Sequence, residues 1–324
     1  MTPLLKVENV VVRFPLQGSF IQSLGFGSAS LIEAVAGVSF TLKEGQTYAI
    51  VGESGSGKTT LARAIAGLHH ADEGSIQYKG NELCQLPEKG FKKYRQDISM
   101  IFQDPFGCLS PRLSIKSIIT EPFQIQKMKD KDLDAEAKRL LSMVGLPADF
   151  ATRYPYQLSG GQARRVGVAR ALSLNPKLII ADEPTAGLDV SIQGELLNLL
   201  VKLQNDIGLS FVVISHNLNI VKHISDKMGI MYLGRFVEEG LTDEIFKHPK
   251  HPYTFSLLSA NPEPDPDAKI DRVELLGDPP SIMHRPKGCE FHTRCPFVKE
   301  KCKIEIPKIV YPEQSQAYSC HYSL

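Results

Sequence analysis

Short apolar runs alternate along the chain with amphipathic stretches. Residues 47–51, 178–182 and 211–215 are apolar over almost their whole length and pass into polar or glycine-rich residues, which is typical of strands buried on both faces. Leucine, alanine and valine at helical spacing within 133–144 predict an amphipathic helix. Strands separated by helices predict an α/β fold with a mostly parallel sheet. Residues 74–83 have instead the pattern of a strand and turn in an antiparallel portion.

Proline usage separates a tail from the rest of the chain. Eleven of the 21 prolines of this 324-residue chain lie in 249–324. We therefore predict one domain over 1–248, followed by a Pro-rich linker and a small unit over 249–324. Within that stretch, "NPEPDPD" (261–267) has the composition of a linker.

Charge and hydropathy limit the partners and the location. The formal net charge is +1, so there is no electrostatic basis for a nucleic-acid partner. No apolar run approaches the ~20 residues that a membrane-spanning helix needs. The N-terminus lacks the basic region and apolar core of a secretory signal. We therefore expect a cytosolic protein, in which disulfides are disfavoured.

A glycine-rich loop, "GESGSGKTT" (52–60), fits the phosphate-loop pattern G-x-x-x-x-G-K-S/T between a predicted strand and a predicted helix. Its glycines let backbone N–H groups approach phosphate oxygens, and the helix N-terminus adds a partial positive charge. Lys58 can reach the β- and γ-phosphates, and the Thr59 hydroxyl can ligate Mg²⁺. The predicted ATP-binding residues of the loop are Gly52, Glu53, Ser54, Gly55, Ser56, Gly57, Lys58, Thr59 and Thr60.

The predicted strand 178–182 ends in one acidic residue, Asp182, and a second, Glu183, follows it directly. Asp182 suits Mg²⁺ coordination, directly or through water. Glu183 is a candidate to orient and deprotonate an attacking water. Because many strands end in acids, this pair indicates catalysis only in combination with the loop at 52–60.

The stretch "LSGGQ" (158–162) combines a natural helix N-cap, Ser159, with two glycines and a following helical pattern. A capped helix N-terminus with bare glycine backbone is an anion site. Placed just upstream of the acidic strand, the stretch resembles the signature motif of ATP-binding cassette (ABC) ATPases. The resemblance implies that the stretch contacts the ATP of a partner subunit through Ser159, Gly160, Gly161 and Gln162.

Further motifs of that family follow. Gln103 in "IFQDP" resembles the glutamine that senses Mg²⁺ and the attacking water, and Asp189 in "AGLD" resembles the acid of the loop that crosses to the partner. His216 in "VISHN" is similar to the switch histidine at the γ-phosphate. Phe14 is the candidate for the aromatic that stacks on adenine, with a core position as the alternative, and residues 15–30 insert beside it. The resemblance implies catalytic roles for Glu183, His216 and Gln103, and Mg²⁺ ligation by Thr59, Gln103 and Asp182.

The resemblance covers about 4–248 and implies an ABC-type P-loop NTPase. Its expected parts are an α/β core, an antiparallel β portion and a helical subdomain at about 104–160. In this family two nucleotide-binding domains face head to tail, and each ATP lies between the phosphate loop of one and the signature of the other. ATP binding closes the pair, and hydrolysis reopens it.

A single cassette without a membrane span favours a transporter subunit that works with separate membrane proteins. "EPTAGLDVSIQGELLNLLVKLQ" (183–204), "HPKHPYTFSLLSANP" (248–262) and the cysteine-rich tail resemble the oligopeptide/dipeptide importer subfamily, which also includes nickel and oligosaccharide importers. This implies ATP hydrolysis coupled to peptide uptake at the cytoplasmic face of the membrane. The implied partners are a second ABC ATPase subunit, homologous or identical, two integral membrane permease subunits and an external substrate-binding protein. A soluble ABC ATPase not involved in transport is the alternative from another class.

The segment after Gln103 is expected to contact the membrane subunits in such a transporter. Leu109, Leu113 and Ile115 predict either an apolar seat for a membrane subunit or ordinary core of the helical subdomain.

Four cysteines gather in the tail, with the spacing C-x₅-C-x₆-C-x₁₇-C. Since disulfides are disfavoured in the cytosol, thiolate ligation of a metal is the leading interpretation. The tight C-x₂₋₄-C knuckles of structural zinc sites are absent, and wide gaps suit an iron–sulfur cluster. The importer resemblance includes this pattern and implies a 4Fe-4S cluster, while Zn²⁺ with a nearby histidine (His284, His292 or His321) or a chance clustering are the alternatives. The cysteines concerned are Cys289, Cys295, Cys302 and Cys320, whereas Cys84 and Cys108 have no predicted role.

Overall fold

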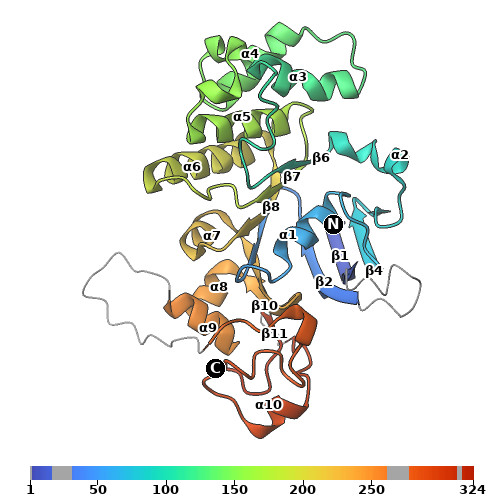
Figure 1. Cartoon of the computed structure of the whole chain (residues 1–324), viewed down its shortest axis with the longest axis vertical. Helices are drawn as coiled ribbons and strands as arrows, with labels where there is room; N and C mark the ends of the chain where they lie inside the picture. The colour runs from blue at the N-terminus through green and yellow to red at the C-terminus, as the bar shows by residue number, and fades with distance from the viewer. Residues whose placement is uncertain (1, 17–30, 261–276, 312–315) are drawn as a thin grey trace. The chain divides into compact units, whose positions relative to one another are not determined.

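The computed structural model describes residues 2–16, 31–260, 277–311 and 316–324 (Figure 1). The predicted linker 261–267 and most of the predicted insertion lie outside these residues. The protein divides into two compact units. Unit 1 comprises Met1–Leu42, Tyr48–Gln85 and Ser215–Leu324, and unit 2 comprises Lys43–Thr47 and Leu86–Ile214.

Unit 1 contains an antiparallel sheet with the strand order β2-β1-β4-β5. Its strands are β1 (Leu5–Pro15), β2 (Leu31–Leu42), β4 (Glu73–Tyr78) and β5 (Asn81–Glu82). Valine and leucine side chains of β1 and β2 are buried, which is the pattern of a sheet covered on one face. The prediction of an antiparallel portion around 74–83 is confirmed, because β4 and β5 pair there.

A second set of strands in unit 1 has the order β11-β10-β9-β3, with β3 parallel to β9 and the other neighbours antiparallel. These strands are β3 (Thr47–Val51), β9 (Lys227–Tyr232), β10 (Arg235–Leu241) and β11 (Ala317–Tyr318). The helices of unit 1 are α1 (Lys58–Ile65), α7 (Leu218–Ile224), α8 (Thr242–Lys247), α9 (Pro252–Ser259) and α10 (Glu300–Ile304), with a 3₁₀ turn at Ile282–His284. Apolar side chains of β3, β9, α7, α8, α9 and the tail share one buried cluster.

Unit 2 contains the parallel strands β6, β7 and β8, in the order β8-β7-β6. They span Ile98–Ile101, Leu178–Asp182 and Ser210–Ser215. Every residue of β7 and β8 is buried, as predicted for apolar runs of this kind. The α/β class with a parallel sheet is thus confirmed.

The helices of unit 2 include a cluster in which α3, α4 and α5 contact one another (Figure 1). The helices are α2 (Glu88–Phe91), α3 (Ile115–Ile125), α4 (Leu133–Met143), α5 (Gly160–Leu172) and α6 (Val190–Ile207), with 3₁₀ turns at Tyr94–Gln96, Ala148–Thr152 and Pro155–Gln157. The helix predicted within 133–144 is confirmed as α4, which begins at an Asp132 cap. In the described part of the chain, no helix is both long enough and apolar enough to cross a membrane.

Candidate functional site

The loop between β3 and α1 has the geometry of a phosphate loop. Lys58 begins α1 and is 7% exposed, and its ammonium donates to the carbonyl oxygens of Gly52 (2.8 Å) and Glu53 (2.7 Å). Its Nζ also lies 3.3 Å from the Ser56 hydroxyl. The side chain therefore lies along the inner side of the loop, where its charge is held next to the N-terminus of α1. Thr59 follows in the first turn of that helix.

Two glycines of this loop are required by its shape. Gly57 has a φ of 102°, in the left-handed region that favours glycine, and a Cβ there would meet the Ala34 carbonyl oxygen. A Cβ at Gly52 would meet the Met231 carbonyl oxygen. The turn between β9 and β10 also holds the loop backbone, because the Gly234 N–H donates to the Ser56 carbonyl oxygen at 2.8 Å. Larger residues at these positions would force the loop open.

The carboxyl end of β7 in unit 2 holds the two predicted acids. Asp182 is 2% exposed and Glu183 is 8% exposed. Glu183 has a φ of 48°, a left-handed conformation that is uncommon for a residue other than glycine and that concentrates at functional sites. Its N–H donates to the Ile214 carbonyl at 3.0 Å, so the turn is anchored to β8. A buried carboxylate on a strained turn can act on a bound water.

Arg164 supports this turn and was not predicted from the sequence. It lies on α5 and is 4% exposed. Its guanidinium donates to the carbonyl oxygens of Glu183 (3.3 Å) and Ala186 (2.6 Å), and burial lowers its pKa. Arg164, Val168 and Ala171 lie at the helical spacing i, i+4 and i+7, and Val168 and Ala171 are buried. The helical period of the sequence could therefore have placed Arg164 on the buried face of α5.

The signature stretch forms a capping box at the start of α5. The Ser159 hydroxyl accepts from the Gln162 N–H at 3.3 Å, and the Gln162 side chain accepts from the Ser159 N–H at 3.0 Å. Gly161 faces α6, and a Cβ there would lie 2.7 Å from the side chain of Ile192. Glycine thus allows α5 to pack closely on α6, while Gly160 and Ser159 remain accessible at the helix N-terminus.

The remaining predicted residues stand at ends of strands and helices. Gln103 is exposed just after β6, and His216 is exposed just after β8. Asp189 caps α6 by accepting from the Ile192 N–H at 3.0 Å. Phe14 is half-buried on β1, with its ring 5.5 Å from that of His69 in an edge-to-face contact. The phosphate loop, Phe14 and His216 belong to unit 1, and the predicted acids, Gln103, Asp189 and the signature belong to unit 2.

Comparison with known families accounts for this set of motifs. Residues 35–186, which include the phosphate loop, the signature and the acidic strand, match the family model described as "ABC transporter". Residues 237–302 match "Oligopeptide/dipeptide transporter, C-terminal region". The oligopeptide transport ATP-binding protein AppF of Bacillus subtilis is 44% identical over 322 residues, covering 98% of this chain and 97% of that protein. The chain belongs to the ABC transporter ATP-binding family.

Two further similarities support this assignment. The oligopeptide transport ATP-binding protein OppF of Salmonella typhimurium is 47% identical over 303 residues, covering 92% of this chain and 90% of that protein. The ATP-binding cassette MJ0796, solved as a dimer in a post-hydrolysis state with ADP and Pi, has a TM-score of 0.64 and 30% identity over 74% of this chain and 98% of that chain. The ABC cassette fold is confirmed, and with it ATP hydrolysis coupled to transport as the activity of this ABC protein.

The three apolar residues singled out in the segment after Gln103 differ in burial. Leu109 is 2% exposed and Ile115 is fully buried, so neither can offer an exposed apolar seat, whereas Leu113 is 38% exposed. Of the two interpretations of these positions, the core interpretation holds for Leu109 and Ile115.

The four tail cysteines line one small cavity together with His292 and His321. All four cysteines are free thiols, and Cys302 is buried. Burial raises the pKa of Cys289 and of Cys295 to about 11. Among the described residues, no three or more His, Cys, Asp or Glu side chains are arranged to hold a metal ion. The prediction of a 4Fe-4S or Zn²⁺ site is therefore not supported by this arrangement, although the thiols are of the right chemistry.

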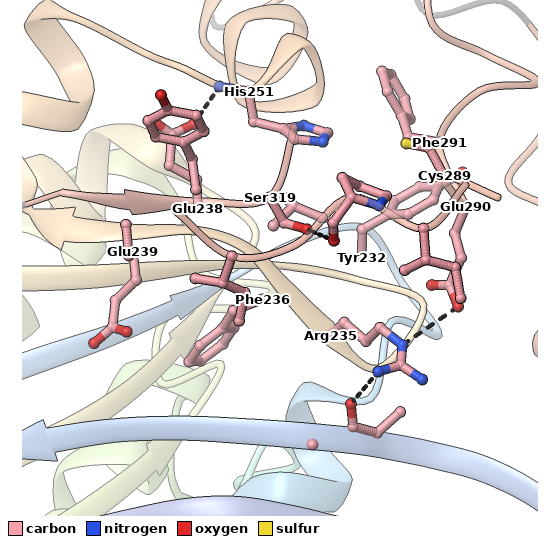
Figure 2. Close-up of a pocket in the computed structure, with 18 of the residues that line it drawn as sticks. Tyr232, Arg235, Phe236, Glu238, Glu239, His251, Cys289, Glu290, Phe291 and Ser319 are labelled. Atoms are coloured by element: carbon pink, nitrogen blue, oxygen red, sulfur yellow. Dashed lines mark hydrogen bonds and ion pairs between the residues drawn. The ribbon is translucent and has the colours of Figure 1, made fainter. Parts of the chain in front are cut away.

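A larger pocket of unit 1 lies between β10 and the tail (Figure 2). Two of its charged groups, Arg235 and Glu238, contact the tail. Arg235 donates to the Ala36 carbonyl at 2.9 Å and pairs with Glu290 at 3.4 Å, and the Glu238 carboxylate accepts from the His251 N–H at 2.9 Å. Burial raises the pKa of Glu239 to about 7. Apart from Cys289, the predicted site residues do not line this pocket, which is separate from the phosphate loop.

Proposed function

We propose that this chain is the ATP-hydrolysing subunit of an importer for oligopeptides or dipeptides. The observation that carries the proposal is the match of residues 237–302 to the oligopeptide/dipeptide transporter C-terminal region, in addition to the ABC match. Full-length similarity to oligopeptide transport ATP-binding proteins supports the same cargo. The cassette would span 1–248, and 249–324 would be the appendage typical of these importers.

Within the cassette, each motif has a proposed task. Lys58 would bind the β- and γ-phosphates, and loop N–H groups would bind phosphate oxygens. Mg²⁺, when bound, neutralises phosphate charge, and Thr59, Gln103 and Asp182 would hold it. Glu183 would orient and deprotonate the attacking water, and His216 would contact the γ-phosphate.

The signature is proposed to act on the ATP of a second ABC subunit. Its capped helix N-terminus presents glycine N–H groups to an anion, as the capping box leaves that end of α5 accessible. Asp189 would contribute from the loop that crosses to the partner. The assembly would include a homologous or identical ATPase, two permease subunits and an external substrate-binding protein. This chain would then lie at the cytoplasmic face of the membrane.

A cellular uptake assay tests the cargo and the role of Lys58 together. In cells that lack this chain, the wild-type protein should restore uptake of a labelled tetrapeptide, and Lys58→Ala should not, because the loop loses its charge contact with ATP. Lys202→Ala, at an exposed position of α6, should restore uptake fully. Restoration of nickel or oligosaccharide uptake without peptide uptake would assign another cargo. No change in any uptake would instead favour an ATPase outside transport.

We also propose that the four tail cysteines ligate a 4Fe-4S cluster, with Zn²⁺ as the alternative. The proposal starts from the four free cysteines that line one cavity, and it requires their thiols to move into ligating positions that they do not occupy in this structure. The full chain purified without oxygen should contain about four iron atoms per molecule by elemental analysis and should absorb visible light. Cys302→Ser should lose both signals, and Cys108→Ser, outside the tail, should keep them. About one zinc per chain without colour would assign zinc, and a metal-free protein would reject the proposal.

A further inference from the structure

The phosphate loop of unit 1 is held from outside by the tail. Glu53, the second residue of the loop, is paired through its carboxylate with Arg294, whose two terminal guanidinium nitrogens both donate, at 2.7 and 3.0 Å. The Arg294 side chain is 5% exposed and that of Glu53 is 25% exposed. A two-pronged arginine–carboxylate pair of this kind fixes direction as well as distance. It joins residues that are 241 positions apart in the chain.

A second contact fixes the backbone of the same residue. The Glu53 N–H donates to the Tyr253 hydroxyl at 3.0 Å. Tyr253 is fully buried on α9, whose N-terminus is capped by the His251 ring. Both the side chain and the N–H of Glu53 are thus bound to residues that come after the cassette motifs in the sequence.

The third polar group of Glu53 contacts the lysine of the phosphate loop. Its carbonyl accepts from the Lys58 ammonium at 2.7 Å. Glu53 therefore connects Arg294 and Tyr253 on one side with the phosphate-binding lysine on the other. A displacement of Glu53 would move the carbonyl that positions Lys58.

Arg294 itself is anchored by the tail fold. Its N–H donates to the Phe291 carbonyl at 3.0 Å. The rings of Tyr232, Tyr253 and Phe291 pack together, with centroids 4.8 to 5.4 Å apart. Figure 2 shows Tyr232 and Phe291 among the residues around the neighbouring pocket. Arg294 directly precedes Cys295, so the turn that carries it belongs to the cysteine-rich segment.

The Glu53–Arg294 pair also changes the net charge of the phosphate loop. Glu53 places a carboxylate in a loop that is proposed to bind a polyanion, and like charges repel at short range. Arg294 neutralises this carboxylate and holds it toward the tail. Without the arginine, the loop would be both less ordered and more negative.

We propose that Arg294 is a positioning residue for the phosphate loop, and that the folded tail thereby sets the affinity of this subunit for ATP. The inference rests on the proposed assignment of 52–60 as the ATP-binding loop. It adds to that assignment a dependence of ATP binding on a residue far outside the cassette motifs.

The test measures equilibrium binding of a fluorescent ATP analogue to the purified full-length chain, with thermal unfolding as a check on folding. Arg294→Gln should weaken binding about tenfold or more, which corresponds to about 1.4 kcal/mol. Arg294→Lys, which keeps the charge without the planar fork, should have an intermediate effect. In the double variant Glu53→Gln/Arg294→Gln the repulsion from the unpaired carboxylate is gone but the anchor to the tail is still missing, so only part of the lost affinity should return. Hydrogen exchange at 52–57 should be faster in Arg294→Gln than in the wild type.

Two reference variants separate the possible failures. Lys303→Gln removes another cation of the tail, which pairs with Glu300 at 2.6 Å on the surface, and should leave ATP binding within about twofold of the wild type. Lys58→Ala tests the loop assignment itself. If Lys58→Ala loses binding but Arg294→Gln binds normally, the positioning role is wrong and the loop assignment stands. If Lys58→Ala binds normally, the loop assignment fails and the inference falls with it. Full recovery of affinity in the double variant would mean that Arg294 only neutralises the carboxylate, and it would also reject the positioning role.

Discussion

Replacing Glu183 with glutamine is expected to slow ATP hydrolysis by about 10²–10⁴-fold while ATP binding is retained. The amide has nearly the same shape as the carboxylate but cannot accept the proton of an attacking water. Glu183 is 8% exposed, and its backbone is held by the Ile214 carbonyl and by Arg164, so the amide should occupy the same place. Single-turnover hydrolysis and retention of bound ATP by the purified chain with its partner subunits measure the two effects separately.

Glu195→Gln is the matched control for this substitution. Glu195 lies in the same unit, its side chain is 57% exposed, and it pairs with Arg165 on the surface. Its loss should leave hydrolysis unchanged. Turnover of Glu183→Gln close to that of the wild type would remove Glu183 from the general-base role, and loss of ATP binding would show that the substitution disturbs the site rather than the chemistry.

Local sequence patterns were sufficient where an element depends on its own residues. The apolar run 178–182 became β7 with the same bounds, because an uninterrupted apolar strand has few alternatives to burial. Ser159 became an N-cap because its hydroxyl and the Gln162 side chain satisfy N–H groups within one turn. The ABC family followed from such local motifs in their order along the chain.

Contacts between distant segments were not predictable in the same way. Arg294 and Tyr253 meet Glu53 only in the folded chain, and nothing in the stretches that resemble the importer subfamily indicates this contact with the phosphate loop. Leu109 and Ile115 had the same apolar character as Leu113, and only the packing of unit 2 separates the two buried residues from the exposed one. Residue type predicts that an apolar side chain can be buried, but its neighbours decide whether it is.

Arg164 is an intermediate case. Its spacing from Val168 and Ala171 places it on the buried face of α5, but an arginine in a helix is more often expected at the surface. What makes burial favourable is a set of carbonyl acceptors from another segment, at the turn after β7. The sequence contains the periodicity, and the tertiary structure supplies the acceptors. Arg164 therefore fixes the backbone of the turn that carries Glu183.

Arg164→Met is expected to lower the free energy of unfolding of unit 2 by about 2–4 kcal/mol. Hydrogen bonds from a charged donor contribute about 1.5–3 kcal/mol each, and the loss is partly offset because methionine buries no charge. Lys116→Met is the control, since the Lys116 side chain in the same unit is 36% exposed and pairs with the exposed Asp134, a contact that contributes about 0–1 kcal/mol. Urea unfolding followed by circular dichroism should show the larger loss for Arg164→Met only. Hydrolysis should fall in the same variant, because the carbonyl of Glu183 loses its anchor. Equal losses of stability in the two variants would mean that the buried contacts of Arg164 add nothing beyond a surface pair.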